Sequence, residues 1–388
     1  MGRGVQSALI AVALMGCSVF DPGLVEELER DAGRDAFVAD AGPADTSTAD
    51  VFDASGEDAG TVVFPTAPLR PPAGTEGPDV EERLYALRDA LLNQDGDQWR
   101  TIGFDLDGRH TEAPEYDIEC RPPDEESEPE VDGANGIDNA FSHRLFPLLQ
   151  LALPGLERSV RESQAAGIGA LLLRVTGFNG TEDDPRVDVS FMQSAGGTGS
   201  DEAVSFTDFD LLNEAGGAAP VPSWDGEDRW WARDDGFFSG DEAQPLIRDD
   251  NAYVSDGRLV MRLPERAQFL FITGTEVGAR VRLTDSTVMV DLREGESFGH
   301  VVMAGRWSIL DLLDTGENIG ICMGSTQREI VDSQLLVIAD VRSTAGSGGE
   351  GVECDAISIG VTFQAVPGTW VGLGPSVPLP NPCAAGAE

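Results

Sequence analysis

The chain contains no lysine, and only three histidines and three tyrosines occur among its 388 residues. All 26 basic residues are therefore arginines. They are outnumbered by 69 aspartates and glutamates, so the formal net charge is −43 at pH 7. Because a chain with this charge repels nucleic acids and anionic lipid headgroups, neither is an expected partner. Hydrophobic residues still make up 41% of the chain, which is enough for a folded core.

The hydrophobic run near the start of the chain is short. It extends from Ala8 to Met15, whereas a helix that spans a bilayer needs about 20 apolar residues. Arg3 precedes this run and Gly16-Cys17 follows it, which is the pattern of an export signal with a small residue before the cleavage site. We therefore expect residues 1–16 to be a signal peptide.

The four residues from Leu14 to Cys17 resemble the lipobox of bacterial lipoproteins. This resemblance implies that the Cys17 thiol is diacylated and that the acyl chains hold the protein in a membrane. The alternative is an ordinary signal peptide with a cysteine near the cut. In lipoproteins an aspartate after the cysteine often signals retention in the inner membrane, so Ser18 favours the outer membrane or the cell surface.

Four cysteines remain besides Cys17, and an even number in an exported chain predicts two disulfides. Three pairings are open. We favour Cys322–Cys354, which closes a local loop, together with Cys120–Cys383, which ties the two ends of the folded part together. A metal site built from these cysteines is disfavoured, because no CxxC spacing occurs and histidines are few.

Small acidic units repeat in the segment that follows Cys17, at residues 31–33, 40–42 and 58–60. Few aromatics and an excess of acidic residues leave little apolar surface, so we expect residues 17–80 to be a disordered acidic linker. Residues 81–388 then form a β-rich domain. Its segment 194–223, rich in Gly, Ala, Ser and Pro, is either a long loop or a boundary within the domain, and we favour a single domain.

Period-two alternation of apolar residues dominates the chain after residue 81. It predicts strands at 99–106, 171–176, 187–191, 253–255, 258–263, 269–272, 281–283, 287–290 and 357–365. Two hairpin turns are expected, at Asp256-Gly257 and Asp285-Ser286. Helical spacing is confined to segments 141–152, 156–166, 306–313 and 327–339. This pattern favours a mainly β fold, an antiparallel β-sandwich of the jelly-roll or concanavalin-like type with a few inserted helices.

Two loops carry the oxygen ligands that calcium prefers. Asp132, Asn135 and Asp138 alternate with glycines in the first loop, where Asp138 is also suited to cap the helix that follows. The second loop offers Asn179, Asp183 and Asp184. Neither loop has the spacing of an EF-hand, so turn formation and capping explain them without an ion. Calcium is the alternative, and no other cofactor is expected.

Trp224, Trp230 and Trp231 lie among acidic residues, a composition found in sugar-binding sites, although aromatic clusters more often pack in cores. No catalytic site is expected. The three histidines are scattered, and the GxSxG pattern at 295–299 precedes a predicted strand instead of the helix that a nucleophile elbow needs. With 69 acidic residues, the sequence singles out no carboxylate pair for a glycosidase.

The layout resembles a family of uncharacterised acidic bacterial surface lipoproteins. The resemblance rests on residues 99–108, 132–140, 256–257 and 354–358, and it implies an architecture and a location but no activity. We therefore expect a lipid-anchored cell-envelope protein that displays a non-catalytic binding or structural module for an unidentified protein or glycan ligand. The alternatives are a calcium-dependent, lectin-like carbohydrate-binding protein and a carboxylate-based hydrolase.

Overall fold

The computed structural model describes residues 65–74, 82–124, 126–199, 221–273, 277–293, 299–376 and 382–383. The expected signal peptide at 1–16, the lipidation site Cys17 and most of the linker at 17–80 lie outside the described residues. All described residues belong to one compact unit, which comprises residues 62–388.

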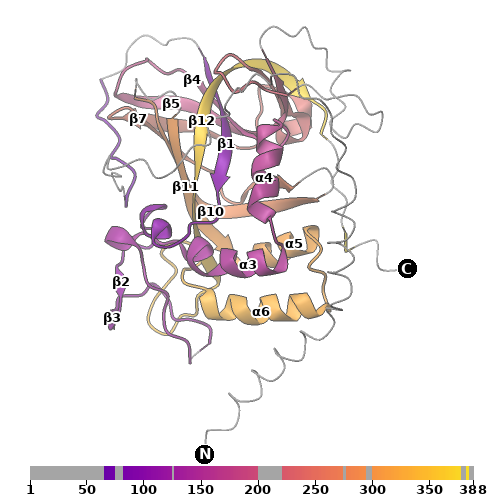
Figure 1. Cartoon of the computed structure of the whole chain (residues 1–388). Helices are drawn as coiled ribbons and strands as arrows, with labels where there is room; N and C mark the ends of the chain where they lie inside the picture. The colour runs from indigo at the N-terminus through magenta and orange to yellow at the C-terminus, as the bar shows by residue number, and fades with distance from the viewer. Residues whose placement is uncertain are drawn as a thin grey trace, which may run out of the picture. The chain divides into compact units, whose positions relative to one another are not determined.

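Eight antiparallel strands form a closed barrel, shown in Figure 1. Each strand pairs with the next one around the ring, and the last strand also pairs with the first. In order around the ring the strands are β1 (Arg83–Leu91), β4 (Leu171–Thr176), β5 (Asp184–Thr198), β7 (Arg248–Ser255), β8 (Arg258–Arg262), β10 (Val277–Asp291), β11 (Gly299–Ser308) and β12 (Ala356–Gly374).

The expectation of a β-sandwich is therefore wrong, although the fold is mainly β. A sandwich consists of two separate sheets, each with its own edge strands. Here β12 pairs with β11 on one side and with β1 on the other, so a single sheet closes on itself.

Two further strands attach to this ring. β6 (Arg229–Arg233) runs antiparallel to the end of β5 and parallel to the end of β12, and β9 (Ala267–Thr273) pairs with the first half of β10. The host strands are long, with 15 residues each in β5 and β10 and 19 in β12, so one part of each belongs to the barrel and another carries the extra strand. A separate two-stranded sheet comprises β2 (Thr111–Glu112) and β3 (Glu115–Tyr116).

Side chains fill the interior of the barrel. One buried apolar cluster contains residues from all eight strands, which is how the inward-facing positions of a closed sheet meet. Leu171 and Leu173 of β4 belong to this cluster, whereas Leu172 between them packs outside the ring beside Trp230. The alternation that predicted the strands therefore also separates the inner face from the outer one.

In the described residues, four α-helices accompany the barrel: α3 (Phe146–Ala152), α4 (Leu156–Ala165), α5 (Ile309–Asn318) and α6 (Thr326–Ile338). A π-helical turn, Phe141–Leu145, leads into α3, and short 3-10 turns lie at Gln98–Thr101, Ala134–Gly136, Asp234–Gly236 and Phe238–Gly240. Figure 1 shows α3, α5 and α6 together at one end of the strands. Ser308 and Ser325 begin α5 and α6 by accepting backbone hydrogen bonds. None of the helices in the described part is long and apolar enough to cross a membrane.

Of the two predicted hairpin turns, one forms and the other does not. The hairpin at Asp256-Gly257 is confirmed, with φ angles of 51° and 70° that suit a type I′ turn. The turn at Asp285-Ser286 is wrong, because β10 runs straight through these residues. Asp285 instead has a φ of 44° and lies where the pairing register with β11 shifts, so the same turn-forming residues make a bulge.

The strand predicted at 99–106 is also wrong. This segment is a 3-10 turn followed by a loop with one bridge, between Phe104 and Asp138. Phe104 is buried, but it packs against the outer face of the barrel beside Val260 and Val302. The apolar alternation here therefore reflects a loop that covers the wall of the barrel.

Residues 65–74, which the sequence assigns to the linker, contact the barrel. The Tyr253 hydroxyl donates to the Pro68 carbonyl at 2.6 Å, and the Arg70 guanidinium stacks on the Tyr253 ring at 4.6 Å from its centroid. The Asp105 amide donates to the Pro65 carbonyl at 2.7 Å. This short stretch is therefore part of the folded unit.

Candidate functional site

Three aspartates on neighbouring loops lie close together beside the barrel. One carboxylate oxygen from each of Asp105, Asp107 and Asp138 lies within 4.8 Å of the other two. Within the described ranges, this is the one group of three or more such side chains with a geometry that could hold a metal ion. We call these residues the aspartate cluster.

Backbone hydrogen bonds position the aspartate cluster. Asp138 accepts a hydrogen bond from the Leu106 amide at 2.7 Å. Asp105 and Asp107 accept hydrogen bonds, at 2.6 and 2.8 Å, from amides two or three residues further along their own loop. Aspartates commonly order loops in this way. The loop geometry therefore accounts for the three positions without an ion.

Burial raises the pKa values of carboxyls in and beside the aspartate cluster. It raises the pKa of Asp138 well above its usual value, with a further contribution from Asp107 and Asp132. Burial also raises the pKa of Asp132 to about 7, and Asp107 and Asp105 add to that shift. Asp132 and Asp138 share a side-chain hydrogen bond, which requires a proton on one of the two carboxyls.

A fourth carboxyl, Asp340, borders the same region and is partly buried. Burial raises the pKa of Asp340 to about 7, although the amide and hydroxyl of Ser358 both donate to it and oppose the shift. The cavity that Asp107, Asp132, Asp138 and Asp340 line has a volume of only about 10 Å³. That volume has room for about one water molecule and excludes a substrate.

A buried arginine supplies positive charge next to these carboxyls. Arg306 of β11 donates from Nη1 to Glu119 Oε2 at 2.6 Å and from Nη2 to the Leu106 carbonyl. The positive charge of Arg306 lowers the pKa of Asp107. Burial has a larger effect in the opposite direction, so the pKa of Asp107 is raised overall. Arg306 thus ties the loop of the aspartate cluster to the barrel wall.

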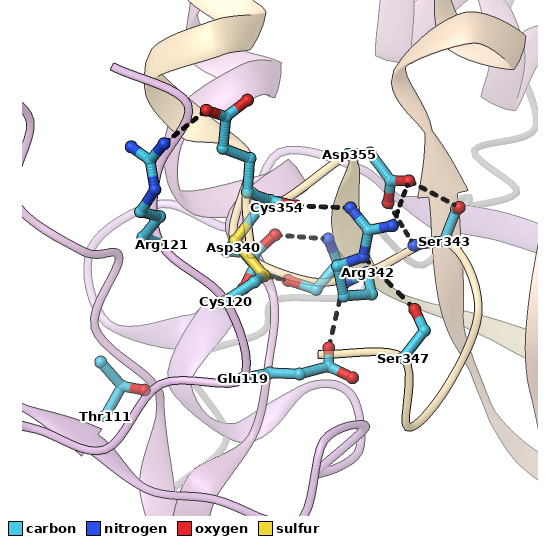
Figure 2. Close-up of a disulfide and its surroundings, with 12 residues drawn as sticks. Thr111, Glu119, Cys120, Arg121, Asp340, Arg342, Ser343, Ser347, Cys354 and Asp355 are labelled. Carbon is cyan, nitrogen blue, oxygen red and sulfur yellow. Dashed lines mark hydrogen bonds and ion pairs between the residues drawn. A yellow bond between two sulfur atoms is a disulfide. The ribbon is translucent and has the colours of Figure 1, made fainter. Parts of the chain in front are cut away.

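Figure 2 shows the disulfide Cys120–Cys354 close to Glu119, the partner of Arg306. The ion pair between Arg121 and Glu353, with 2.5 Å between Nη2 and Oε1, flanks it, and the Arg342 amide donates to Glu119 at 2.9 Å nearby. The second disulfide joins Cys322 to Cys383. The four cysteines predicted to be paired are therefore paired, but the favoured connectivity is wrong.

The structure separates the residues predicted to bind calcium. Asp132 and Asp138 lie together, whereas Asn135 lies exposed at a turn with a φ of 58°. The carboxylates of the second loop already accept backbone hydrogen bonds: Asp184 accepts from the Asn179 amide of the same loop at 2.8 Å, and Asp183 accepts from the Asp256 amide in the turn between β7 and β8 at 3.0 Å. Asp138 was also expected to cap a helix, but its carboxylate accepts from the Leu106 amide, and the Ser142 amide at the start of the π-helical turn donates to Asn139 Oδ1 at 3.3 Å instead.

The sequence interpretation missed Asp105 and Asp107 as candidate ligands. Their signal was the run Asp105-Leu106-Asp107-Gly108, two carboxylates one residue apart before a turn-forming glycine. The expected strand at 99–106 obscured it, because a strand would have pointed both side chains to the solvent face of a sheet.

The three tryptophans considered for sugar binding are buried. Trp230 is completely inaccessible, and Trp224 and Trp231 are 9% and 6% exposed. Trp224 packs against Trp230 with 4.9 Å between ring centroids, and its Nε1 donates to the Ala165 carbonyl at 2.9 Å. Stacking on a sugar needs an exposed ring face, which these side chains do not offer.

An apolar groove lies between α3 and α6, away from the aspartate cluster. It has a volume of about 480 Å³, and among the described residues no ionisable side chain lines it. Leu151 and Ile330 on its two sides are 81% and 58% exposed. The lining residues are Leu145, Leu148, Leu149, Leu151, Leu153, Ile319, Gly320, Ile321, Gln327, Ile330, Val331 and Gln334. We call this feature the helix groove.

The helix groove has the size and chemistry of a binding site. Ligand sites commonly have volumes of about 300–1,000 Å³ and mostly apolar walls, and exposed apolar side chains that lie together mark interaction surfaces. Gln327 and Gln334 of α6 are the polar lining residues with side-chain hydrogen-bonding groups. Comparisons of the chain with protein-family models, with curated proteins and with solved structures found no match.

Proposed function

We propose that this protein is an exported, lipid-anchored module of the cell envelope that binds another molecule through its outer surface and catalyses no reaction. The helix groove carries the binding part of this proposal, because it combines an apolar hollow of about 480 Å³ with exposed aliphatic side chains. The packed barrel interior supports an outer binding surface, since the core side chains occupy the inner space.

The two disulfides support export, because such bonds persist in oxidising compartments. The resemblance of Leu14 to Cys17 to a lipobox supports anchoring at the outer membrane or cell surface. The absence of catalysis is supported by the position of four carboxyls with raised pKa: Asp107, Asp132, Asp138 and Asp340 line a cavity of about 10 Å³, whereas a catalytic carboxyl has to reach a substrate. Glu157, whose pKa burial also raises, lines a wider hollow of about 670 Å³, where it accepts the Asn93 amide and lies 3.8 Å from Arg161.

Membrane fractionation of the full chain and its Cys17→Ala variant tests the anchor. We expect the wild-type chain in the membrane fraction, with a diacylated amino-terminal cysteine detected by mass spectrometry, and the variant in the soluble fraction. A wild-type chain without acyl groups, or a variant that stays in the membrane fraction, would overturn the lipid-anchor part of the proposal.

A further inference from the structure

We propose that the helix groove binds a cationic amphipathic helix of a partner protein. This inference deepens the proposed binding function and rests on it. Three features of the described residues carry it: the arrangement of the two helices, the depth of the groove and the charge around it.

The groove is shaped by helices that lie side by side. Figure 1 shows α3 and α6 next to each other at the same end of the barrel, and α6 also contacts the π-helical turn that leads into α3. Side-chain ridges on two adjacent helices leave a groove into which the ridge of a third helix packs. An amphipathic helix fills such a groove with apolar residues spaced three or four positions apart.

The floor of the groove continues into the core. A second apolar cavity of about 30 Å³ shares Leu145, Leu149 and Val331 with the groove and reaches Trp307 of β11 and Leu312 of α5. A recess in an apolar surface is where the end of a partner's apolar side chain packs. The groove therefore offers an apolar surface with a small recess in its floor.

The charges beside the groove favour a basic partner. Exposed Glu329 and Asp332 flank Ile330 on α6. The one basic residue of α6, Arg328, is held at 3.1 Å by Glu317 and at 2.7 Å by Asp332. The sequence of α3 carries no charge, and the whole chain has a net charge of −43. A polar face rich in lysine or arginine is therefore attracted to this surface, and an acidic one is repelled.

Peptide binding to the full chain with Cys17→Ala tests the partner. The probe is a fluorescent Leu/Lys peptide of about 18 residues, or five helical turns, with all leucines on one face. A Leu/Glu peptide with the same apolar face and a Leu/Lys peptide of scrambled order are the controls. We expect saturable binding of the first peptide alone. Equal binding of the scrambled peptide would overturn the inference, because it would reflect charge attraction without a groove.

Variants locate the binding site. Leu151→Asn and Ile330→Asn change exposed side chains and keep the charge, and each should weaken peptide binding about tenfold, as expected for the loss of one buried aliphatic side chain. Leu246→Asn is the matched control, since Leu246 is 55% exposed and lies outside the groove. An equal loss in all three variants, or no loss in the two groove variants, would overturn the inference.

Two further probes separate this inference from the proposed function. Nile red, an uncharged apolar dye, should bind wild type and lose affinity in the groove variants. If the dye behaves so but the Leu/Lys peptide does not bind, the groove is a binding site and the helix partner is wrong. If neither binds, both proposals fail. Binding to phosphatidylcholine vesicles that depends on Leu151 and Ile330 would identify a lipid surface and overturn the helix partner.

Discussion

Arg306 and Glu119 form an ion pair that is almost completely removed from water. Their side chains are 1% and 5% exposed, and 2.6 Å separates Arg306 Nη1 from Glu119 Oε2. Glu119 also accepts the Arg342 amide at 2.9 Å, so one carboxylate joins strand β11 to two segments that lie far apart in the chain. Charges this deeply buried are tolerated only when they are fully paired.

Removing one partner of this pair should destabilise the protein strongly. We expect Glu119→Gln to lower the free energy of unfolding by about 3–5 kcal/mol, because Arg306 stays buried and keeps only the longer contact of 3.5 Å with the Asp285 carboxylate. Urea unfolding followed by tryptophan fluorescence measures this change. The control is Arg158→Ala, which breaks an exposed pair with Glu162 and should cost less than about 1 kcal/mol. Similar costs for both variants would show that the buried pair has no special role.

Stability should rise when the pH is lowered from 8 to 5. The folded-state pKa values of Asp132 and Asp340 are about 7, and the unfolded value of an aspartate is about 3.9. Between these values the folded chain binds protons that the unfolded chain releases, so stability falls as the pH rises through 7. Thermal unfolding at pH 5, 6, 7 and 8 measures this dependence.

The Asp132→Asn variant identifies the carboxyl responsible. Its amide can still accept from the Thr111 amide and can donate to Asp138, so the local contacts are preserved while the titrating group is lost. We expect a shallower pH dependence than in wild type, whereas Glu265→Gln at an exposed position should leave it unchanged. An unchanged slope in Asp132→Asn would contradict the assignment.

Calcium and magnesium should have equal and small effects on thermal stability. The aspartate cluster offers three carboxylates, each of which already accepts a backbone amide, whereas calcium takes six to eight oxygens. Melting temperatures of the full chain in EDTA, in about 1 mM Ca²⁺ and in about 1 mM Mg²⁺ would test this; ions at 100-fold over Kd stabilise by about 2.7 kcal/mol. A rise of several degrees with calcium alone, abolished by Asp105→Asn, would establish a calcium site.

Replacing Gly197 should disturb the packing of Trp230. A Cβ atom at Gly197 would lie 2.7 Å from the Trp230 ring, and one at Gly368 would lie 2.6 Å from Trp230 Cδ1. We expect Gly197→Ala to cost about 1–3 kcal/mol through overpacking. Gly236→Ala is the control, because its Cβ would meet no atom within 4 Å. Urea unfolding measures both, and equal stabilities would show that Trp230 has room to move.

Local features of the fold could be predicted from the sequence, but its closure could not. Strands such as β4 and β12 and the turn at Asp256-Gly257 follow from alternation and from residues that accept a positive φ. The pairing of β1 with β12 joins Leu84 to Gly368, and no local pattern encodes which distant strands meet. A barrel and a sandwich share the same alternation, so the sequence pattern alone does not separate them.

The candidate sites depend even more than the fold on contacts between segments that lie far apart in the chain. Asp138 was recognised as an oxygen ligand, but its neighbours Asp105 and Asp107 come from a loop about 30 residues earlier in the chain, which the bridge between Phe104 and Asp138 brings beside it. Aromatic residues among acids suggested a sugar site at Trp230, although the glycines that enclose this ring lie on β5 and β12. The helix groove arises between the almost entirely apolar α3 and the mixed polar and apolar α6, and neither sequence indicates that the other helix lies beside it.

The contact between the first and last strands of the ring also determines when this chain can fold. No nascent segment contains all the barrel contacts until β12, which ends at Gly374, has been made, and contacts between distant segments form slowly. Cys120 and Cys354 are separated by 234 residues, so their disulfide also forms only after the late part of the chain has been made. A long-lived unfolded chain would ordinarily aggregate, but a net charge of −43 keeps unfolded copies apart, so the acidic composition protects the chain before the barrel exists.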